Sequence, residues 1–307
     1  MNFEAFASAA NQENTMVHFI DVGQGDSIFI DTSGLDVLVD GGTRAAGVTV
    51  VDYLGKLSIS RIHLMVATHM DADHIGGLIT VLSSAIQVDE VLTNNQAGTS
   101  ATYNDFMSLA ITHSIKVAQR GDVLILAEDV NLTVLSPVQP LEFEDQNENS
   151  VVMRLQVGDS SFLLMGDAEA DTEEDILQSG VEVDSDVLKV GHHGSRSSTT
   201  DALLNSVSPS IAVISAGEDN QYGHPHQETL DKLFAHGITV YGTYKSGNIV
   251  ATANSTAIDF SKALSPILEF PSMIVIASLM LSLLIVVVIY RRKKCFLKAP
   301  TKFYGLH

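Results

Sequence analysis

The chain has 307 residues, 45% of them hydrophobic, which is enough for one large domain or two small ones. Its single cysteine, Cys295, excludes an intramolecular disulfide and a cysteine-based metal site. Six of the 17 basic residues follow position 290, where no acid occurs, so the first 290 residues carry a formal charge of −26. This charge opposes broad binding to a phosphate backbone, although metal ions can still bring one phosphodiester to a site.

Short apolar runs alternate with amphipathic stretches through the first half of the chain. Residues 1–15 are a polar leader, either the remnant of a secretory signal peptide or an ordinary disordered segment. The pattern predicts strands at 16–20, 27–31, 36–39, 61–67, 89–93, 123–126 and 132–136, and helices at 48–56 and 103–113.

The second half continues in the same style. It predicts a hairpin of strands 151–156 and 161–165, strands at 187–190 and 211–215, helices at 169–179, 200–207 and 226–236, and a last hairpin of strands 239–244 and 248–253. Two strand-rich halves with helices between them favour two packed sheets covered by helices, in one domain at 16–260.

The C-terminal region differs in composition from the rest. After a short tether at 261–270, residues 271–290 carry no charge, and as a helix they would span about 30 Å, one hydrocarbon core. Basic residues open the tail at 291–307. We therefore expect a transmembrane helix with a cytoplasmic tail and an extracellular domain; the alternative is a buried core helix.

A cluster of metal-capable side chains follows the strand predicted at 61–67. His69, Asp71, Asp73 and His74 occupy six positions, and two glycines and a helix start follow. Four such side chains exceed the needs of one tetrahedral ion, so they predict two adjacent divalent ions, with zinc accepting both ligand types. Two ions that share a water form a hydrolytic centre. The alternative is a polar helix cap with surface acids.

Other polar residues also stand where predicted strands end. Asp167 is positioned to bridge two ions or to cap the helix that follows. His192 and His193 lie between glycines and suit a ligand plus a proton donor or phosphate contact. His224 and His226 open a helix, so that one caps it and the other faces the pocket.

Two glycine-rich turns, at 21–27 and 40–42, are also distinctive. The first is similar to a phosphate-cradling loop, but no lysine follows and no helix begins there. We expect a tight hairpin connection beside the site.

Together these motifs resemble the metallo-β-lactamase superfamily and, more narrowly, the hydrolase domain of ComEC-type competence proteins. The matching segments lie in the family's order across residues 16–258, at 21–27, 40–42, 68–77, 147–150, 166–167, 192–195 and 223–226. The resemblance implies an α/β fold, an αββα four-layer sandwich with the metal site at one edge of its two sheets. With the predicted span, the expected fold is this sandwich plus one C-terminal transmembrane helix.

The resemblance also assigns ligands. His69 and Asp71 would serve one ion, Asp73 and His74 the other, and Asp167 would bridge, with His192 as a further ligand. The usual pattern has a histidine in place of Asp71 and another near 147–150, so one ion is expected to be held less firmly or replaced by water contacts. The residue that completes the second site stays open among His192, His193, His224 and His226.

We expect a metal-dependent phosphodiesterase or nuclease outside the membrane, in which metal-bound hydroxide attacks phosphorus. Its cofactor would be one or two divalent ions, zinc or else manganese, and its partners a phosphodiester or nucleic acid and the membrane, with no protein partner evident. The alternatives are a thioester, lactone or β-lactam hydrolase and a non-catalytic surface module. The proposed catalytic residues are Asp73, His193 and His226, and the proposed substrate contacts are Lys189, Ser195, His224, Asn147 and Ser150.

Two further expectations concern the whole chain. The channel domain of the full competence protein is absent from this sequence, so DNA transport is not implied. Residues 268–271 and the apolar span also resemble archaeal surface-protein sorting signals, which implies removal of the span and attachment to lipid.

Overall fold

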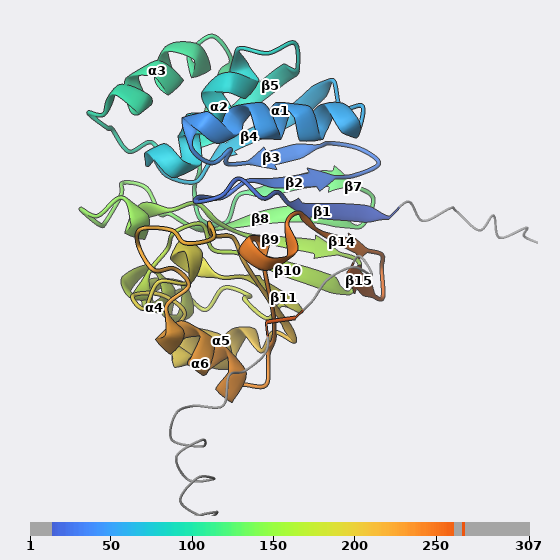
Figure 1. Cartoon of the computed structure of the whole chain (residues 1–307), viewed down its shortest axis with the longest axis vertical. Coiled ribbons are helices and arrows are strands. Elements are labelled where there is room, and N and C mark those ends of the chain that lie inside the picture. Colours follow the sequence, from blue (N-terminus) through green and yellow to red (C-terminus); the bar gives the residue numbers. More distant parts are fainter. Residues whose placement is uncertain (1–13, 261–265, 268–307) are drawn as a thin grey trace, which may run out of the picture. The chain divides into compact units, whose positions relative to one another are not determined.

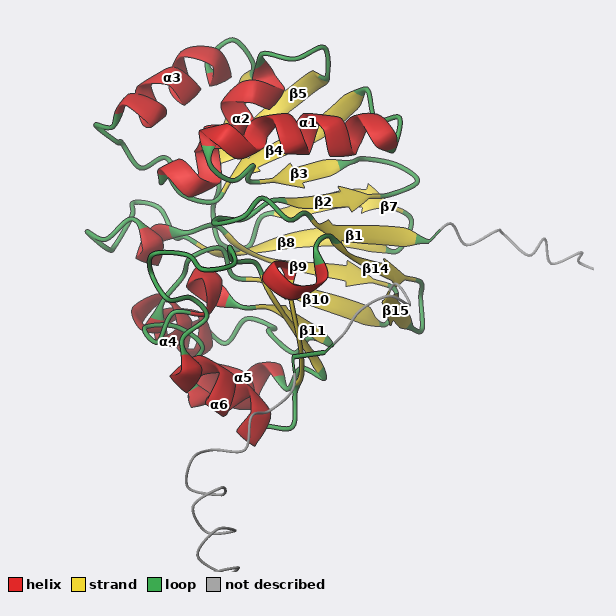
Figure 2. Cartoon of the chain, viewed as in Figure 1, coloured by secondary structure: helices red, strands yellow, loops and turns green. Residues whose placement is uncertain are grey.

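Two β-sheets pack face to face and carry helices on their outer faces in the computed structural model, which describes residues 14–260 and 266–267 (Figures 1 and 2). The first sheet has the order β15 (Ile258–Phe260), β14 (Ile249–Ala253), β1 (Thr15–Phe19), β2 (Ile28–Asp31), β3 (Val37–Val39), β4 (Arg61–Ala67), β5 (Gln87–Thr93) and β6 (Ser114–Val117). The second has the order β13 (Thr239–Gly242), β12 (Ile211–Ile214), β11 (Val187–Lys189), β10 (Ser160–Leu164), β9 (Val152–Val157), β8 (Val130–Ser136) and β7 (Val123–Ala127).

Within residues 14–260, three α-helices cover each sheet. The first carries α1 (Gly47–Lys56), α2 (Ala72–Leu82) and α3 (Ala101–Ala110), and the second carries α4 (Ala170–Ser179), α5 (Asp201–Val207) and α6 (Gln227–Ala235) (Figure 1). A short helix, α7 (Thr243–Ser246), follows β13. The αββα sandwich expected from the sequence is therefore confirmed.

The core has three parts because each sheet is buried on both faces. Side chains such as Phe19 and Phe162 fill the space between the sheets. Leu78 of α2 packs on the outer face of the first sheet, and Ile176 of α4 packs on that of the second. Strands covered on both sides are nearly continuous apolar runs, which is why most of them are visible in the sequence.

The β9–β10 hairpin is confirmed, but the predicted last hairpin is wrong. β13 pairs in parallel with β12 in the second sheet, whereas β14 pairs antiparallel with β1 in the first. α7 lies between them, where the chain crosses from one sheet to the other. Strands adjacent in sequence therefore belong to different sheets here, and a local turn pattern cannot show that.

The predicted transmembrane helix needs correction. Among the described residues, no helix is long and apolar enough to cross a membrane, and the longest, α2, has 11 residues, about 16 Å. The predicted span at 271–290, the tail at 291–307 and the leader residues 1–13 lie outside the described residues. Within the described residues the fold is therefore the sandwich alone, and we do not propose membrane anchoring or an extracellular location.

A close approach of backbones fixes α2 against the turn after β3. A Cβ added at Gly77 would lie 1.8 Å from the carbonyl oxygen of Gly41. We expect Gly77→Ala to destabilise the protein by about 2 kcal/mol or more, since the helix must move away from the turn. Gly55→Ala in α1 is the matched control, because a Cβ there meets nothing within 4 Å and helix propensity favours alanine by roughly 0.8–1 kcal/mol. Urea unfolding of both variants checks this; equal effects would contradict it.

His18 on β1 predicts a pH-dependent stability. It is 2% exposed, and its Nδ1 lies 2.8 Å from the Tyr53 hydroxyl. Burial lowers the pKa of His18 to about 4, so the unfolded chain binds more protons between pH 6.5 and 4. Stability should therefore fall as pH falls through this window, by about 3 kcal/mol in all. Urea unfolding at both ends of the window should show a smaller change for His18→Gln; parallel curves would contradict this role.

Candidate metal centre

The predicted ligands meet at one edge of the sandwich, where several strands end. His69 and Asp71 follow β4, and Asp73 lies in the first turn of α2. Asp167 follows β10, and His192 and His193 follow β11. Loops at strand ends are held by the rigid sheets beneath them, which fixes side chains from distant segments relative to one another.

Four histidines converge on one carboxylate oxygen. The Nε2 atoms lie 3.2 Å (His74), 3.3 Å (His193), 3.8 Å (His192) and 3.9 Å (His69) from Oδ2 of Asp167. Asp167 itself is 3% exposed. The two segments predicted separately, at 69–74 and 192–193, thus form a single cluster around Asp167.

His74 is oriented by a buried carboxylate behind it. Its Nδ1 lies 2.7 Å from Oδ2 of Asp40. Asp40 in turn accepts hydrogen bonds from the backbone N–H of Thr68 (2.9 Å) and from its hydroxyl (2.7 Å). With Nδ1 occupied, Nε2 faces the cluster, an arrangement common for histidines that bind metals.

The two later histidines are held in the same way. Nδ1 of His193 donates to the Ser215 carbonyl oxygen at 3.0 Å, and Nδ1 of His192 lies 2.5 Å from Oε1 of Glu169. Their φ angles are 54° and 45°, in the left-handed region that non-glycine residues rarely adopt. Such strain concentrates where a site requires a particular side-chain direction.

The carboxylates set the charge of the cluster. Burial opposes the charged forms of His74 and His193, but Asp167 and the other neighbouring carboxylates together outweigh it and hold the pKa of each well above its usual range. Burial likewise opposes a charged Asp167, yet these two histidines hold its pKa well below its usual range. Burial lowers the pKa of His69 to about 4. The centre therefore attracts positive charge.

The donor set fits divalent ions. Nε2 of His69 and Oδ1 of Asp167 are both buried without a hydrogen-bond partner, a cost that an ion would remove. Side chains that could hold ions form the groups His69, His74 and Asp167, and Asp73, His74 and His193. Asp71 Oδ2 lies 3.8 Å from Nε2 of His69. Imidazole and carboxylate together suit zinc or manganese.

The simpler interpretations as helix caps are not supported. Asp71 is the residue before α2, yet its side chain makes no capping hydrogen bond. The residue before α4 is Glu169 rather than Asp167. The carboxylate of Glu148 accepts hydrogen bonds from the first N–H groups of α4, including Thr172 at 2.9 Å.

A cavity of about 100 Å³ opens onto the cluster. It is lined by Gln24, Asp71, Asp73, Asp167, His192, His193, Tyr222 and His224. Of the two histidines His224 and His226, His224 lines the cavity, and burial lowers its pKa to about 4. His226 does not line the cavity; its Nδ1 accepts a hydrogen bond from the backbone N–H of Arg196 at 3.0 Å.

The other predicted substrate residues lie around the cluster rather than in the cavity. Lys189 is fully buried and its Nζ lies 2.7 Å from Oδ2 of Asp26, so it supports the site from behind and does not reach a substrate. Ser195 pairs with the Ser197 hydroxyl at 2.7 Å. The hydroxyl of Ser150 lies 3.4 Å from Nδ1 of His69.

Asn147 lies beside Glu169, where its side-chain hydrogen bond helps to lower the pKa of that carboxyl group, after the larger effect of His192. Glu169 and His192 thus lie between Asn147 and the cavity.

Sequence reasoning did not assign roles to Asp26, Asp40 and Glu169. Asp26 and Asp40 lie in the two glycine-rich turns at 21–27 and 40–42, and these turns are the feature of the sequence that could have indicated a role for them. Gly25 shows why the first turn belongs to the site. Its φ is 113°, and an added Cβ would lie 2.0 Å from the Asp73 carbonyl oxygen, so only glycine lets the turn approach so closely.

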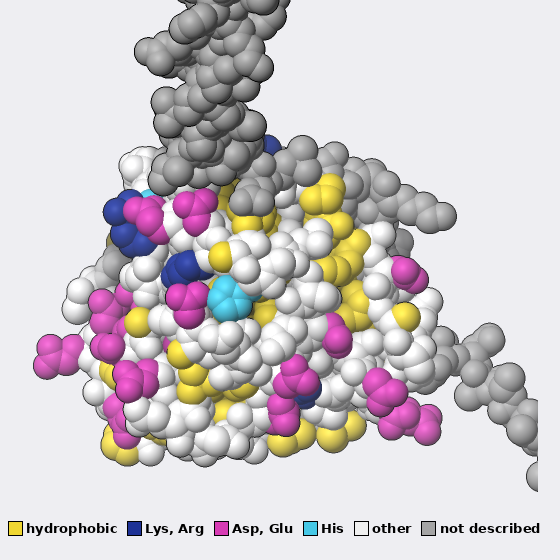
Figure 3. Space-filling model, turned by 90° about the horizontal axis from the view of Figure 1, so that it is seen from below, with side chains coloured by type: hydrophobic (Ala, Val, Ile, Leu, Met, Phe, Trp, Pro, Cys, Tyr) yellow, Lys and Arg dark blue, Asp and Glu magenta, His cyan; other side chains and the backbone are white. Residues whose placement is uncertain are grey.

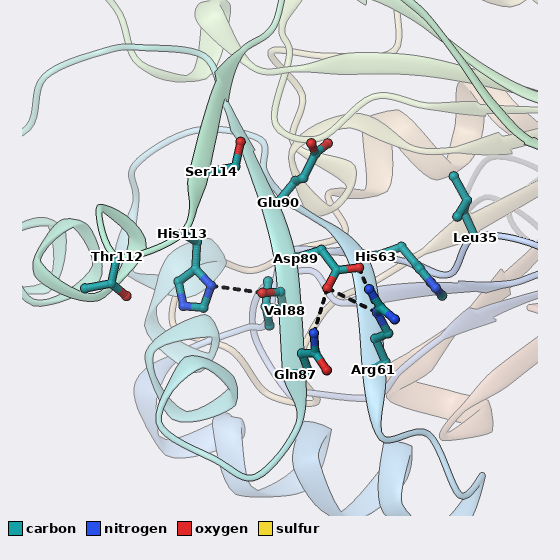
Figure 4. Close-up of a pocket in the computed structure, with 10 residues that line it drawn as sticks. All are labelled: Leu35, Arg61, His63, Gln87, Val88, Asp89, Glu90, Thr112, His113 and Ser114. Atoms are coloured by element: carbon teal, nitrogen blue, oxygen red, sulfur yellow. Dashed lines mark hydrogen bonds and ion pairs between the residues drawn. The ribbon is translucent and has the colours of Figure 1, made fainter.

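A wider hollow of about 730 Å³ lies near the opposite ends of β4 and β5 (Figure 4). Two of its charged groups pair with each other, since Arg61 donates to Asp89 at 2.8 Å. His113 donates to the Val88 carbonyl oxygen at 2.9 Å. Among the described residues, no group of side chains that could hold a metal ion lies at this hollow.

An αββα sandwich with a His/Asp cluster at the edge of its sheets defines a metallo-hydrolase class of fold. The sequence matches the Metallo-beta-lactamase superfamily over residues 20–218, and the chain belongs to that superfamily, which is generally one of metal-dependent hydrolases.

Curated relatives are competence and recombination proteins. The chain is 32% identical to ComE operon protein 3 of Bacillus subtilis over 76% of its length, covering 32% of that protein. It is 32% identical to competence protein ComA of Neisseria gonorrhoeae (80% of this chain, 33% of that one) and 30% identical to recombination protein 2 of Haemophilus influenzae (76% and 28%). The chain thus spans about a third of the length of these relatives.

Proposed function

We propose that this chain is a metal-dependent phosphodiesterase that acts on nucleic acid. The observation that carries the proposal is the convergence of four histidine Nε2 atoms on Asp167, with acids beside them. Relatives named for competence and recombination support nucleic acid as the substrate.

The ligand sets divide between two ions. His69, Asp71 and Asp167 would hold one, while Asp73, His74, His193 and Asp167 would hold the other. When bound, divalent ions polarise a phosphoryl oxygen and lower the pKa of a water molecule so that it attacks at neutral pH. The first set is smaller and includes the half-exposed Asp71, which agrees with the expectation of a less firmly held ion.

His192 is the residue we propose for proton transfer. It lines the cavity and its side chain is 23% exposed, whereas His193 is 1% exposed. Burial lowers the pKa of His192, but Glu169 and Asp167 outweigh that effect and raise it above its usual value. His192 can therefore hold a proton at Nε2 and pass it to the leaving oxygen. The sequence analysis expected the opposite assignment, with His192 as a metal ligand and His193 as the catalytic residue.

Hydrolysis assays of the purified full chain test the proposal. We expect metal in the purified protein by elemental analysis and hydrolysis of bis(p-nitrophenyl) phosphate and oligonucleotides. EDTA should remove the activity, and Zn²⁺ or Mn²⁺ should restore it. Hydrolysis of thioesters, lactones or β-lactams without any phosphodiester cleavage would favour the acyl-hydrolase alternative. Absence of bound metal and of all activity would favour a non-catalytic module.

A further inference from the structure

We infer that Tyr222 is a base-stacking residue that makes single-stranded nucleic acid the preferred substrate; the inference rests on the proposed phosphodiesterase function. Tyr222 lines the catalytic cavity yet is 53% exposed. Its ring lies at 23° to that of His224, with 5.7 Å between centroids. A large aromatic side chain that is half exposed beside a polar cavity contributes little to core packing. Its position suits a contact with a ligand bound in the cavity.

The loop that carries Tyr222 is held in place before any substrate arrives. Oδ1 of Asn220 accepts hydrogen bonds from the backbone N–H groups of Tyr222 (3.1 Å) and His224 (3.0 Å). Nδ2 of Asn220 donates to the Gly217 carbonyl oxygen at 2.9 Å. A fixed loop loses little conformational entropy when a ligand stacks on it, which raises the affinity that stacking provides.

The charge of the protein limits how nucleic acid can bind. Among the described residues, those that line the cavity include no Lys or Arg. Figure 3 shows Asp and Glu side chains spread over the face seen from below, with fewer Lys and Arg. Successive phosphates along a strand would therefore be repelled, and a substrate gains charge-based affinity only where one phosphodiester meets the ions. Further affinity must come from an uncharged group.

A nucleobase supplies that uncharged group. Stacking on an aromatic side chain tolerates any base and strengthens binding of single strands. In a duplex the base faces are covered by neighbouring bases, and reaching a protein ring requires unstacking. The cavity of about 100 Å³ is also small. The geometry therefore points to a flexible single strand or strand end, with one base on Tyr222 and the adjoining phosphodiester at the ions.

Steady-state kinetics on three substrates test this inference. The substrates are a short fluorescein-labelled oligothymidylate, a strand of equal length and charge with abasic residues, and the first strand annealed to its complement. We expect Tyr222→Ala to raise KM for the oligothymidylate about tenfold, with a much smaller change in kcat. Tyr222→Phe should retain the wild-type KM. The wild type should bind the abasic strand as weakly as Tyr222→Ala binds the oligothymidylate.

Controls separate this inference from the function on which it rests. Ile125→Ala removes a large apolar side chain that is 66% exposed on β7, away from the cavity, and should leave KM unchanged. Anisotropy with phosphorothioate strands repeats the comparison without appreciable turnover. An unchanged KM in Tyr222→Ala, or equal cleavage of duplex and single strand, would overturn the stacking inference alone. Failure to hydrolyse any phosphodiester, bis(p-nitrophenyl) phosphate included, would overturn the proposed function and this inference with it.

Discussion

Replacing Asp167 with asparagine is expected to lower phosphodiester hydrolysis by more than about 100-fold. Losses of 10- to 100-fold are typical when a group behind a metal ligand is removed, and Asp167 is the carboxylate on which all four histidines converge. Asparagine keeps the shape but not the charge, so metal content should fall along with activity. Elemental analysis and kinetics with bis(p-nitrophenyl) phosphate measure both.

The fold should survive this change, because the backbone N–H of residue 167 still donates to the Ser150 hydroxyl at 3.2 Å. Asp201→Asn is a matched control. That carboxylate is 70% exposed at the start of α5 and pairs with His236 at the surface, so its loss should change neither metal content nor activity. Full activity and full metal content in Asp167→Asn would disprove the proposed centre.

The sequence predicts the centre best where ligands share one short segment. His69 to His74 follow an apolar strand, and that context alone indicates a metal site. Partners brought together by tertiary structure leave no such pattern. Asp40 and His74 are 34 positions apart, and Asp26 and Lys189 are 163 apart. The sequence does not show that Lys189 pairs with Asp26. The prediction that Lys189 contacts phosphate is for this reason wrong, since the side chain is buried beneath the site.

The fold is predictable to a similar degree. β4 is predicted with its observed bounds because it is a long apolar strand bounded by polar residues. β6 and β15 are edge strands of four and three residues, and none of these residues is fully buried. Both strands are too short for their alternation of apolar and polar residues to identify them in the sequence. The crossing between β13 and β14 depends on the pairing of β14 with β1, more than 200 residues earlier in the chain, which no local pattern records.

Replacing Lys189 with methionine should destabilise the protein by about 3–5 kcal/mol. Lys189 is fully buried, and its ammonium group donates to Oδ2 of Asp26 at 2.7 Å and to the Val190 carbonyl oxygen at 3.0 Å. Asp26 is 1% exposed, so methionine leaves Oδ2 of a buried carboxylate without the ammonium group that pairs with it. Urea unfolding measures the loss. Lys245→Met, at an exposed pair with Glu218, should cost less than about 1 kcal/mol.

A double variant shows whether the loss comes from the unpaired charge. Asp26→Asn with Lys189→Met removes both charges and should recover much of the stability, because burying neither charge avoids their desolvation. If it is as unstable as Lys189→Met alone, lost packing rather than charge is the cause. Oδ1 of Asp26 also lies 3.3 Å from Nδ1 of His193. Under conditions where Lys189→Met is folded, its metal affinity should therefore fall about 10- to 100-fold, because the group that orients a ligand has lost its own partner.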